Sequence, residues 1–182
     1  MYLGTDYKYY FTMDPVLPRF IRVKMRKEYI VSDALKGWLQ SDYANDESGS
    51  NFIRIIISQG RISYALDHLL PDSPDSVKLG YSASQLEWCR KNEAATWSFF
   101  IDQKLLFNTD PNMLSKYTND GPGTNGFPKE SPGNIGQYTG MKIVEAYMKK
   151  NPRVSIQKLM DEKDLQKIFR DSGYKPAKAL FK

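Results

Sequence analysis

Apolar residues recur at three- and four-residue spacing along most of the chain, and this pattern predicts a mainly helical protein. The strongest period runs over residues 51–70, and Pro71 follows it directly. Because proline cannot continue a helix, we expect this core helix to end there. Its apolar face consists of Phe52, Ile55, Ile56, Ile62, Leu66, Leu69 and Leu70.

A second long helix is predicted over residues 84–107. Two overlapping capping boxes mark its start, Ser82 with Gln85 and Ser84 with Glu87. A third helix is predicted over residues 134–150, where the spacing of Gly136 and Gly140 leaves a flat strip that lets another backbone come close. We expect these two helices to bury Leu86, Cys89, Trp97, Phe100 and Ile101, and Ile135, Tyr138, Val144 and Tyr147, respectively.

The remaining pattern is weaker. Helices are expected over residues 16–27, 32–43, 155–160 and 164–170, with Ser32 as an N-cap, an extended stretch over residues 1–13 and a polar loop over residues 45–50. Residues 108–133 hold four of the ten prolines and are expected to form a long irregular segment, which is a common place for a functional site. The predicted fold class is therefore mostly α, a compact multi-helix domain spanning residues 1–182 with long irregular loops.

The charge of the chain is mildly positive, with a formal net charge of +5. Basic residues cluster at positions 19–27, where Arg19, Arg22, Lys24, Arg26 and Lys27 alternate with apolar residues. Such a cluster fits an anionic surface, but it is more typical of a solvated helix face. Because no DNA- or RNA-reading motif accompanies it, we do not expect nucleic acid as a partner.

The chain has a single histidine, His68, and a single cysteine, Cys89. A catalytic zinc ion commonly needs two histidines and a carboxylate, so we expect no metal, no cofactor and no catalytic residue of that kind. No internal disulfide is possible with one cysteine, and Cys89 lies in a helical pattern typical of a buried structural thiol. His68 is expected to bind carbonyl groups near the end of its helix.

Two polar residues lie on apolar stripes, Gln59 on the first long helix and Glu93 on the second. Buried polar groups need partners, so these helices are expected to pack together with Gln59, Glu93 or Tyr64 bonded to each other or to water. One interpretation is a structural network. The other is an acid–base site, because burial raises the pKa of a carboxyl group toward the range of a general acid.

Five ordered motifs resemble the gliding-motility lipoprotein GldB family. They are residues 134–148, which begin with Asn-Ile-Gly-Gln-Tyr-Thr-Gly and follow Lys-Glu-Ser-Pro at 129–132; Ser-Gly-Tyr-Lys-Pro at 172–176; Met-Tyr-Leu-Gly-Thr-Asp-Tyr-Lys-Tyr-Tyr at 1–10; residues 59–72, which begin with Gln-Gly-Arg-Ile-Ser-Tyr; and the stretch from Gly-Tyr-Ser at 80–82 to Trp97. Together they span nearly the whole chain. The resemblance implies a longer lipoprotein of which this chain is the C-terminal part, facing the periplasm and tied to the membrane only through a lipid anchor that the chain lacks.

More distant relatives resemble helical zinc peptidases with an HExxH helix. Here the matching helix would fall in residues 28–43, which lack histidine, and Gln59-Gly60 stands where Glu-Gly is usual. The resemblance therefore implies a zincin-like scaffold without peptidase activity that binds an envelope protein or peptide. The alternative is a metallopeptidase-like hydrolase, degenerate or active, that acts on peptide or cell-wall bonds. The expected partner groove is formed by Gln59, Tyr64, Glu93, Trp97, Phe127, Lys129, Ser131 and Tyr138.

Overall fold

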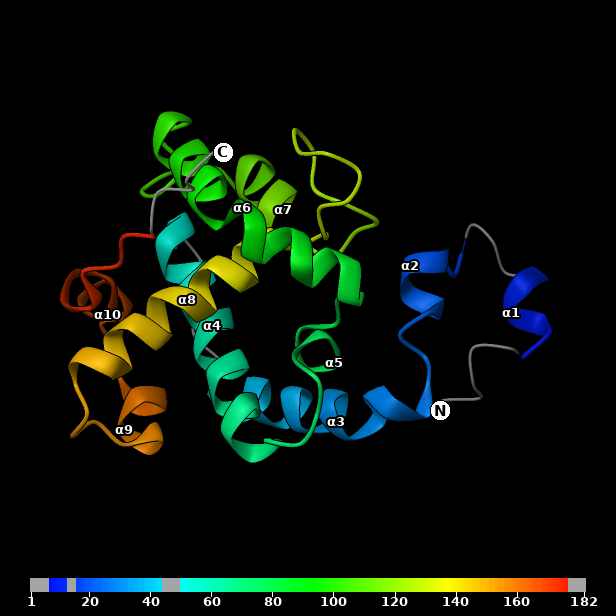
Figure 1. The fold of residues 1–182 in the computed structure, drawn as a ribbon, viewed down its shortest axis with the longest axis horizontal. Helices are drawn as coiled ribbons and strands as arrows, with labels where there is room; N and C mark the ends of the chain where they lie inside the picture. Colours follow the sequence, from blue (N-terminus) through cyan, green and yellow to red (C-terminus); the bar gives the residue numbers. More distant parts are fainter. Residues whose placement is uncertain (1–6, 13–15, 44–49, 177–182) are drawn as a thin grey trace.

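The computed structural model describes residues 7–12, 16–43 and 50–176, and all regular elements in these ranges are helices (Figure 1). The prediction of a mostly α fold is therefore confirmed. Two predicted helices, α4 (Phe52–Leu69) and α8 (Ile135–Lys150), form the main helix pair of the core. The start and the end of α4 agree with the sequence pattern. Asn51 caps the helix by accepting a hydrogen bond from Arg54 N at its Oδ1, and Pro71 follows the end.

Glycines allow α4 and α8 to cross at backbone contact. A Cβ atom at Gly140 would lie 1.7 Å from the carbonyl oxygen of Ile56, and one at Gly60 would lie 2.2 Å from the carbonyl carbon of Gly140. A Cβ atom at Gly136 would meet Ile56 Cγ2 at 2.7 Å. The flat strip predicted from the glycine spacing is thus confirmed, and the backbone that approaches it is that of α4.

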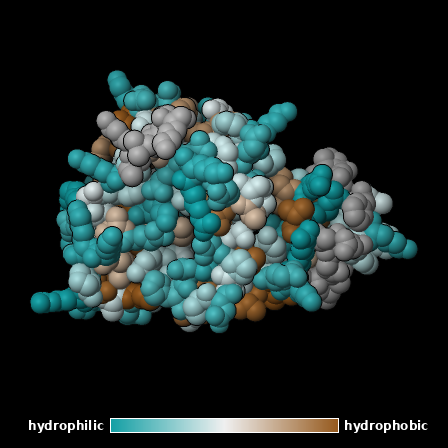
Figure 2. All heavy atoms as spheres, viewed as in Figure 1, coloured by the Kyte–Doolittle hydropathy of each residue, from teal (hydrophilic) through white to brown (hydrophobic). Residues whose placement is uncertain are grey.

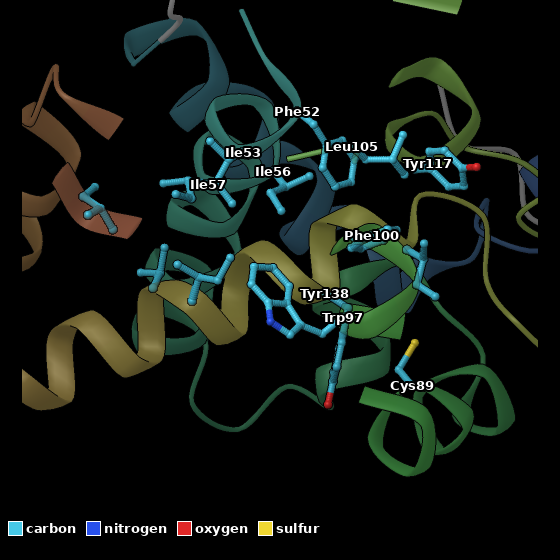
Figure 3. Packing of buried hydrophobic residues seen from close by; sticks show 14 of the residues in the cluster. Phe52, Ile53, Ile56, Ile57, Cys89, Trp97, Phe100, Leu105, Tyr117 and Tyr138 are labelled. Carbon is cyan, nitrogen blue, oxygen red and sulfur yellow. The ribbon is translucent and has the colours of Figure 1, made fainter. Parts of the chain in front are cut away.

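Aromatic rings fill the core beside this crossing (Figure 3). Phe52 packs edge-on against Phe100, with ring centroids 4.8 Å apart, and this contact joins the first turn of α4 to α6 (Ala83–Asp102). Tyr117 from α7 (Pro111–Thr118) closes the cluster at 5.8 Å from Phe100. Helix α7 lies inside the segment that was predicted to be irregular, so that prediction is wrong for these residues. Asp110 caps it and Pro111 occupies its first turn.

Helix α6 begins as predicted but ends earlier. Ser82 and Gln85 form a complete capping box. The helix bends at Asn92, whose side-chain amide donates to the carbonyl of Trp88. It stops at Asp102 rather than at residue 107, and Ile101 is 48% exposed rather than buried. The other four residues expected on its buried side are buried.

The N-terminal part differs most from the sequence pattern. Helix α1 (Tyr9–Thr12) lies where an extended stretch was expected, and α2 (Arg19–Arg22) covers only part of the predicted helix over residues 16–27. Helix α3 (Lys27–Asp42) starts five residues before Ser32, so this serine is a buried interior residue and not a cap. Most of the predicted polar loop at residues 45–50 falls outside the described residues.

Short helices complete the molecule: α5 (Asp75–Leu79), α9 (Ile156–Asp161) and α10 (Leu165–Ser172). The last two match prediction, and their caps are Ser155 and Asp164. Most of the surface drawn in Figure 2 is hydrophilic, with apolar residues emerging in small patches, one of them along the edge where α3 lies. Within the described ranges, no helix has the length and apolar character that a membrane span requires.

Candidate functional site

The most unusual polar cluster of the protein lies where α8 begins. Residues 131–140 are all buried, although they include the end of an irregular loop. Asn134 stands just before α8 with φ 54° and ψ 46°, a left-handed conformation, and its side chain makes no capping bond to the helix. The backbone carbonyl of Asn134 instead accepts a 2.7 Å hydrogen bond from the hydroxyl of Tyr81.

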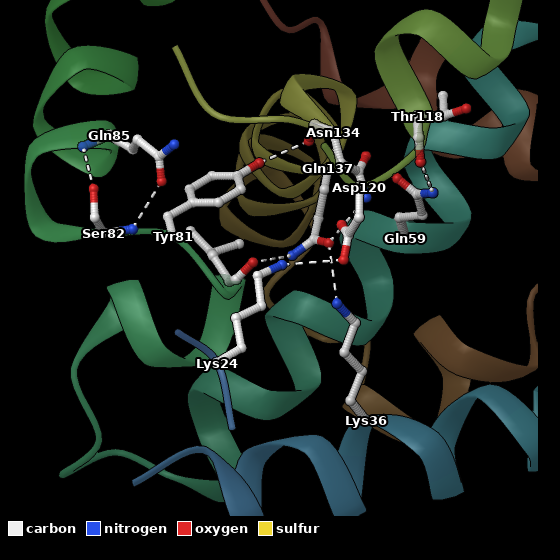
Figure 4. A network of polar contacts seen from close by, with 11 residues as sticks. Lys24, Lys36, Gln59, Tyr81, Ser82, Gln85, Thr118, Asp120, Asn134 and Gln137 are labelled. Carbon is white, nitrogen blue, oxygen red and sulfur yellow. Dashed lines mark hydrogen bonds and ion pairs between the residues drawn. The ribbon is translucent and has the colours of Figure 1, made fainter. Parts of the chain in front are cut away.

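Gln137 is the centre of this cluster (Figure 4). Its Oε1 accepts hydrogen bonds from Lys36 Nζ at 3.1 Å and from Asn134 Nδ2 at 3.4 Å, and its Nε2 donates to the carbonyl of Leu79 at 3.3 Å. Burial lowers the pKa of Lys36, and Asp120 opposes this shift. The bond from Lys36 to the uncharged amide oxygen of Gln137 joins α3 to the start of α8.

Gln59 approaches the same place from α4. Its Nε2 donates to the carbonyl of Thr118 at 3.1 Å. Gln59 Oε1 and Asn134 Oδ1 are buried, and neither has a hydrogen-bond partner among the described residues. Since buried polar atoms are nearly always paired, two unpaired acceptors in one cluster are unusual.

Both residues line one cavity of about 350 Å³, which we call the amide pocket. Its lining is polar apart from one isoleucine, and its members are Lys36, Gln40, Gln59, Ile62, Thr118, Asn119, Asp120, Asn134 and Gln137. A neighbouring cavity of about 480 Å³ shares Lys36 and Asp120 with it. The ion pair between Lys24 Nζ and Asp120 Oδ2, 3.0 Å long, lies where these cavities meet.

A larger cleft of about 940 Å³ continues from there and shares Lys24 and Gly80 with the neighbouring cavity. We call it the basic cleft. It runs between α2 and the first turns of α6, and the loop around Lys129 borders it. Five basic residues line it against two acidic ones: Arg19, Lys24, Arg26, Lys91 and Lys129, against Glu87 and Glu130.

Three of the cleft cations are available for a ligand. Lys24 pairs with Asp120, and Lys91 pairs with Glu87 at 3.3 Å. Within the described ranges Arg19, Arg26 and Lys129 form no ion pair. The half-buried ring of Trp88 also lines the cleft, so that an apolar contact is offered beside the charges.

Glu93 has a different role from the one expected. Its carboxylate accepts hydrogen bonds from the hydroxyls of Tyr138, at 3.3 Å, and Tyr174, at 2.9 Å. Burial and the adjacent carboxylate raise the pKa of both phenols, so each remains a donor at neutral pH. The expected bond between Glu93 and Gln59 or Tyr64 is not formed, because Gln59 turns to Thr118 and the ring of Tyr64 lies on His68.

The eight residues of the expected groove do not line one common cavity. Gln59 lines the amide pocket, Lys129 the basic cleft, and Tyr138 a small cavity of about 90 Å³. Phe127 is packed among the rings of Trp88, Phe99, Phe100 and Tyr117, Trp97 lies against Phe169 and Tyr174, and Ser131 is fully buried. Their role in binding a partner stays a prediction.

Several residues that line the amide pocket were not singled out from the sequence. Asn134 and Gln137 belong to the Asn-Ile-Gly-Gln string, but they were noted only as a motif. Lys36 had a detectable signal, because it lies in register with Ser32 and Leu39, both buried, on α3. Asp120 had none, since nothing in the loop sequence predicts its pairing with Lys24.

The single cysteine and the single histidine are placed as expected. Cys89 is buried, and burial raises its pKa to about 12. His68 is exposed, and its Nδ1–H donates to the carbonyl of Tyr64 at 2.9 Å, near the end of α4. No group of three or more His, Cys, Asp or Glu side chains is positioned to hold a metal ion in the part of the chain that the structure describes.

Comparison with protein families gives a match over nearly the whole chain. The model of the family described as gliding motility protein GldB matches residues 1–176. The chain belongs to the GldB family. Membership identifies it as a gliding-motility-associated lipoprotein of the cell envelope. No curated protein and no solved structure matches the chain.

Proposed function

We propose that this GldB-family chain is a non-catalytic envelope domain that binds an extended, acidic segment of a protein or peptide partner in the basic cleft. The observation that carries the proposal is the cleft itself, a groove of about 940 Å³ with a surplus of cations and three of them unpaired among the described residues. Complementary charge steers an acidic segment to such a surface, and Trp88 adds apolar contact.

The hydrolase alternative is not supported by the arrangement of Glu93. A general acid or base needs a carboxyl group within reach of a substrate proton. The carboxylate of Glu93 is engaged by two tyrosines and joins α6 to the segment after α10. Loss of hydrolysis by a Glu93→Gln variant that remains folded, or zinc that copurifies in stoichiometric amount, would favour the alternative over binding alone.

Titration calorimetry with two peptides tests the proposed binding. One is a decapeptide of alternating glutamate and glycine, and the other alternates lysine and glycine. We expect the acidic peptide to bind and the basic one not to, with an affinity that falls as salt is added. The double variant Arg26→Glu, Lys129→Glu is expected to lose at least about tenfold in affinity.

The matched control is Arg153→Glu with Lys158→Glu, two exposed basic residues outside the cleft that carry the same change in charge. If the control weakens binding as much as the cleft variant does, only net charge matters and the cleft is not the site. Equal binding of the acidic and basic peptides contradicts the proposal as well.

A further inference from the structure

The amide pocket has a hydrogen-bonding pattern that specifies its ligand. Gln59 Oε1 and Asn134 Oδ1 are open acceptors, and Lys36 Nζ has N–H donors beyond the one that Gln137 accepts. Asn134 is only 6% exposed, so an unpaired oxygen there is costly in the free protein. The pocket therefore favours a ligand that donates at two points and accepts at one.

The orientation of each amide is fixed by its partners. Gln59 must turn Nε2 to the carbonyl of Thr118, which leaves Oε1 open. Gln137 must turn Nε2 to the carbonyl of Leu79, so its Oε1 faces Lys36 and Asn134 Nδ2. Asn134 Oδ1 is then the remaining acceptor. Exchanging the nitrogen and oxygen of any of these amides would place an acceptor against an acceptor or a donor against a donor.

Asn134 also holds an unfavourable conformation. An asparagine directly before a helix commonly accepts a hydrogen bond from an N–H of the first turn. Here the side chain donates to Gln137 instead and the backbone is left-handed. Such departures from local preference are typical of residues selected for binding rather than stability.

Charge decides which donor the pocket takes. A carboxylate would pair with Lys36 but meet the two open oxygens, which repel it. An ammonium group would suit the oxygens, but it would meet Lys36, and the nearby carboxylate of Asp120 already pairs with Lys24. A neutral primary carboxamide matches all three groups in kind, because its NH₂ has two donors and its carbonyl can accept from the lysine.

We propose that the amide pocket binds a primary carboxamide, presented as an asparagine or glutamine side chain of a peptide. The shared residues Lys36, Asp120 and Lys24 connect the pocket to the basic cleft, so an extended peptide in the cleft reaches it. This route of delivery rests on the proposed function. The chemistry of the pocket does not, and uncharged short peptides test it separately.

The experiment uses the full chain labelled with ¹⁵N and three N-acetylated tripeptide N-methylamides, Gly-Asn-Gly, Gly-Asp-Gly and Gly-Leu-Gly. Side-chain NH₂ resonances of Gln59 and Asn134 report binding in the pocket. We expect the asparagine peptide to shift both and to bind at least about tenfold more tightly than the aspartate or leucine peptide. N-acetylglucosamine is titrated in parallel as a hydroxyl-bearing probe.

Two variants and a control assign the site. Gln59→Met removes one open oxygen, and Asn134→Gly removes the other while glycine tolerates the left-handed backbone. Each is expected to weaken binding of the asparagine peptide at least about tenfold, with the far-UV spectrum unchanged. Gln103→Met, at an exposed position outside the pocket, is expected to leave binding unchanged.

Three results would overturn the proposal. The first is equal binding of the three peptides. The second is a larger response to N-acetylglucosamine than to the asparagine peptide. The third is the absence of any shift at Gln59 and Asn134, which means that ordered water alone fills the pocket. Failure of the acidic decapeptide to bind would instead contradict the basic cleft and leave this result standing, because the asparagine tripeptide carries no charge.

Discussion

At the scale of single residues, burial decides chemistry in this protein more than sequence neighbours do. Cys89 and Arg61 are each about 1% exposed and carry groups that react or ionise in water. Burial raises the pKa of Cys89 to about 12 and lowers that of Arg61 to about 10. The thiol is therefore neutral and the guanidinium still charged at physiological pH, and each leads to a measurable consequence.

Cys89 is expected to resist alkylation in the folded protein. Its pKa of about 12 lies well above the ordinary thiol value of 9.0, so thiolate is about 1,000-fold scarcer at neutral pH. Between pH 9 and 12 the unfolded chain releases this proton and the folded chain keeps it. The free energy of unfolding then falls as pH rises, by up to about 1.4 kcal/mol per unit.

Iodoacetamide labelling followed by mass spectrometry checks the reactivity, and urea unfolding at a series of alkaline pH values checks the slope. The difference between wild type and Cys89→Ala isolates the thiol from tyrosines and lysines that titrate nearby. Rapid labelling without unfolding, or the same slope in both proteins, would show that Cys89 is not held as a buried thiol.

Arg61 is expected to be a main anchor of α9. Its Nη1 lies 3.1 Å from the carbonyl oxygen of Leu159, 2.9 Å from that of Met160 and 2.8 Å from that of Glu162. Arg61→Met is predicted to cost about 3 kcal/mol or more, because buried carbonyls lose their donor. Arg61→Lys should recover part of this loss, since it retains a cation. Chemical denaturation measures both, and a loss below about 1 kcal/mol for methionine would contradict the anchor.

At the scale of helices, capping and glycine spacing predicted more than apolar period alone. The bounds of α4 and α8 follow from Asn51, Pro71 and the string at Asn134, where local signals and burial agree. The bounds of α2 and α3 do not, because charged and apolar residues alternate there without a clear stop. Helix α7 was missed because its segment was judged irregular from its proline content, although Pro111 suits the first turn of a helix.

Two glycine substitutions in different helices should have opposite effects. Gly140→Ala places Cβ against the backbone of Ile56 and forces α4 and α8 apart, which is predicted to cost about 3 kcal/mol or more. Gly37→Ala on α3 meets nothing within 4 Å and should stabilise the protein by about 0.5–1 kcal/mol through helix propensity. Thermal unfolding of the pair measures this, and a tolerated Gly140→Ala would refute the close crossing.

The carboxylate of Glu93 is predicted to hold the segment after α10 on α6. Glu93→Gln keeps the shape but removes a charged acceptor of two tyrosine hydroxyls, and a loss of about 1–3 kcal/mol is expected. A double-mutant cycle with Tyr174→Phe measures their coupling. Strictly additive effects would show that the bond to Tyr174 contributes nothing to stability.

At the scale of the whole molecule, the sequence predicted the fold class but not the site. The long helices could be found because each carries its own periodic signal. The amide pocket could not, because Lys36, Gln59, Asp120 and Asn134 come from four separate segments and meet only after α3, α4 and α8 have packed. The same holds for the basic cleft, whose cations come from α2, the segment that follows it, α6 and the loop at Lys129.

The two apolar clusters of the molecule are expected to unfold together. Phe100 belongs to the larger one, and Leu39 on α3 belongs to the smaller one. Helix α4 supplies residues to both, Phe52 to the first and Leu66 to the second, so neither cluster can open without exposing α4. Leu39→Ala and Phe100→Ala are each predicted to cost about 2–5 kcal/mol and to shift one common transition. Circular dichroism and tryptophan fluorescence measured during urea unfolding should coincide in both variants. If Leu39→Ala instead separates the two signals, α3 unfolds as an independent unit, and the packing of α3 on α4 is not what couples the two clusters.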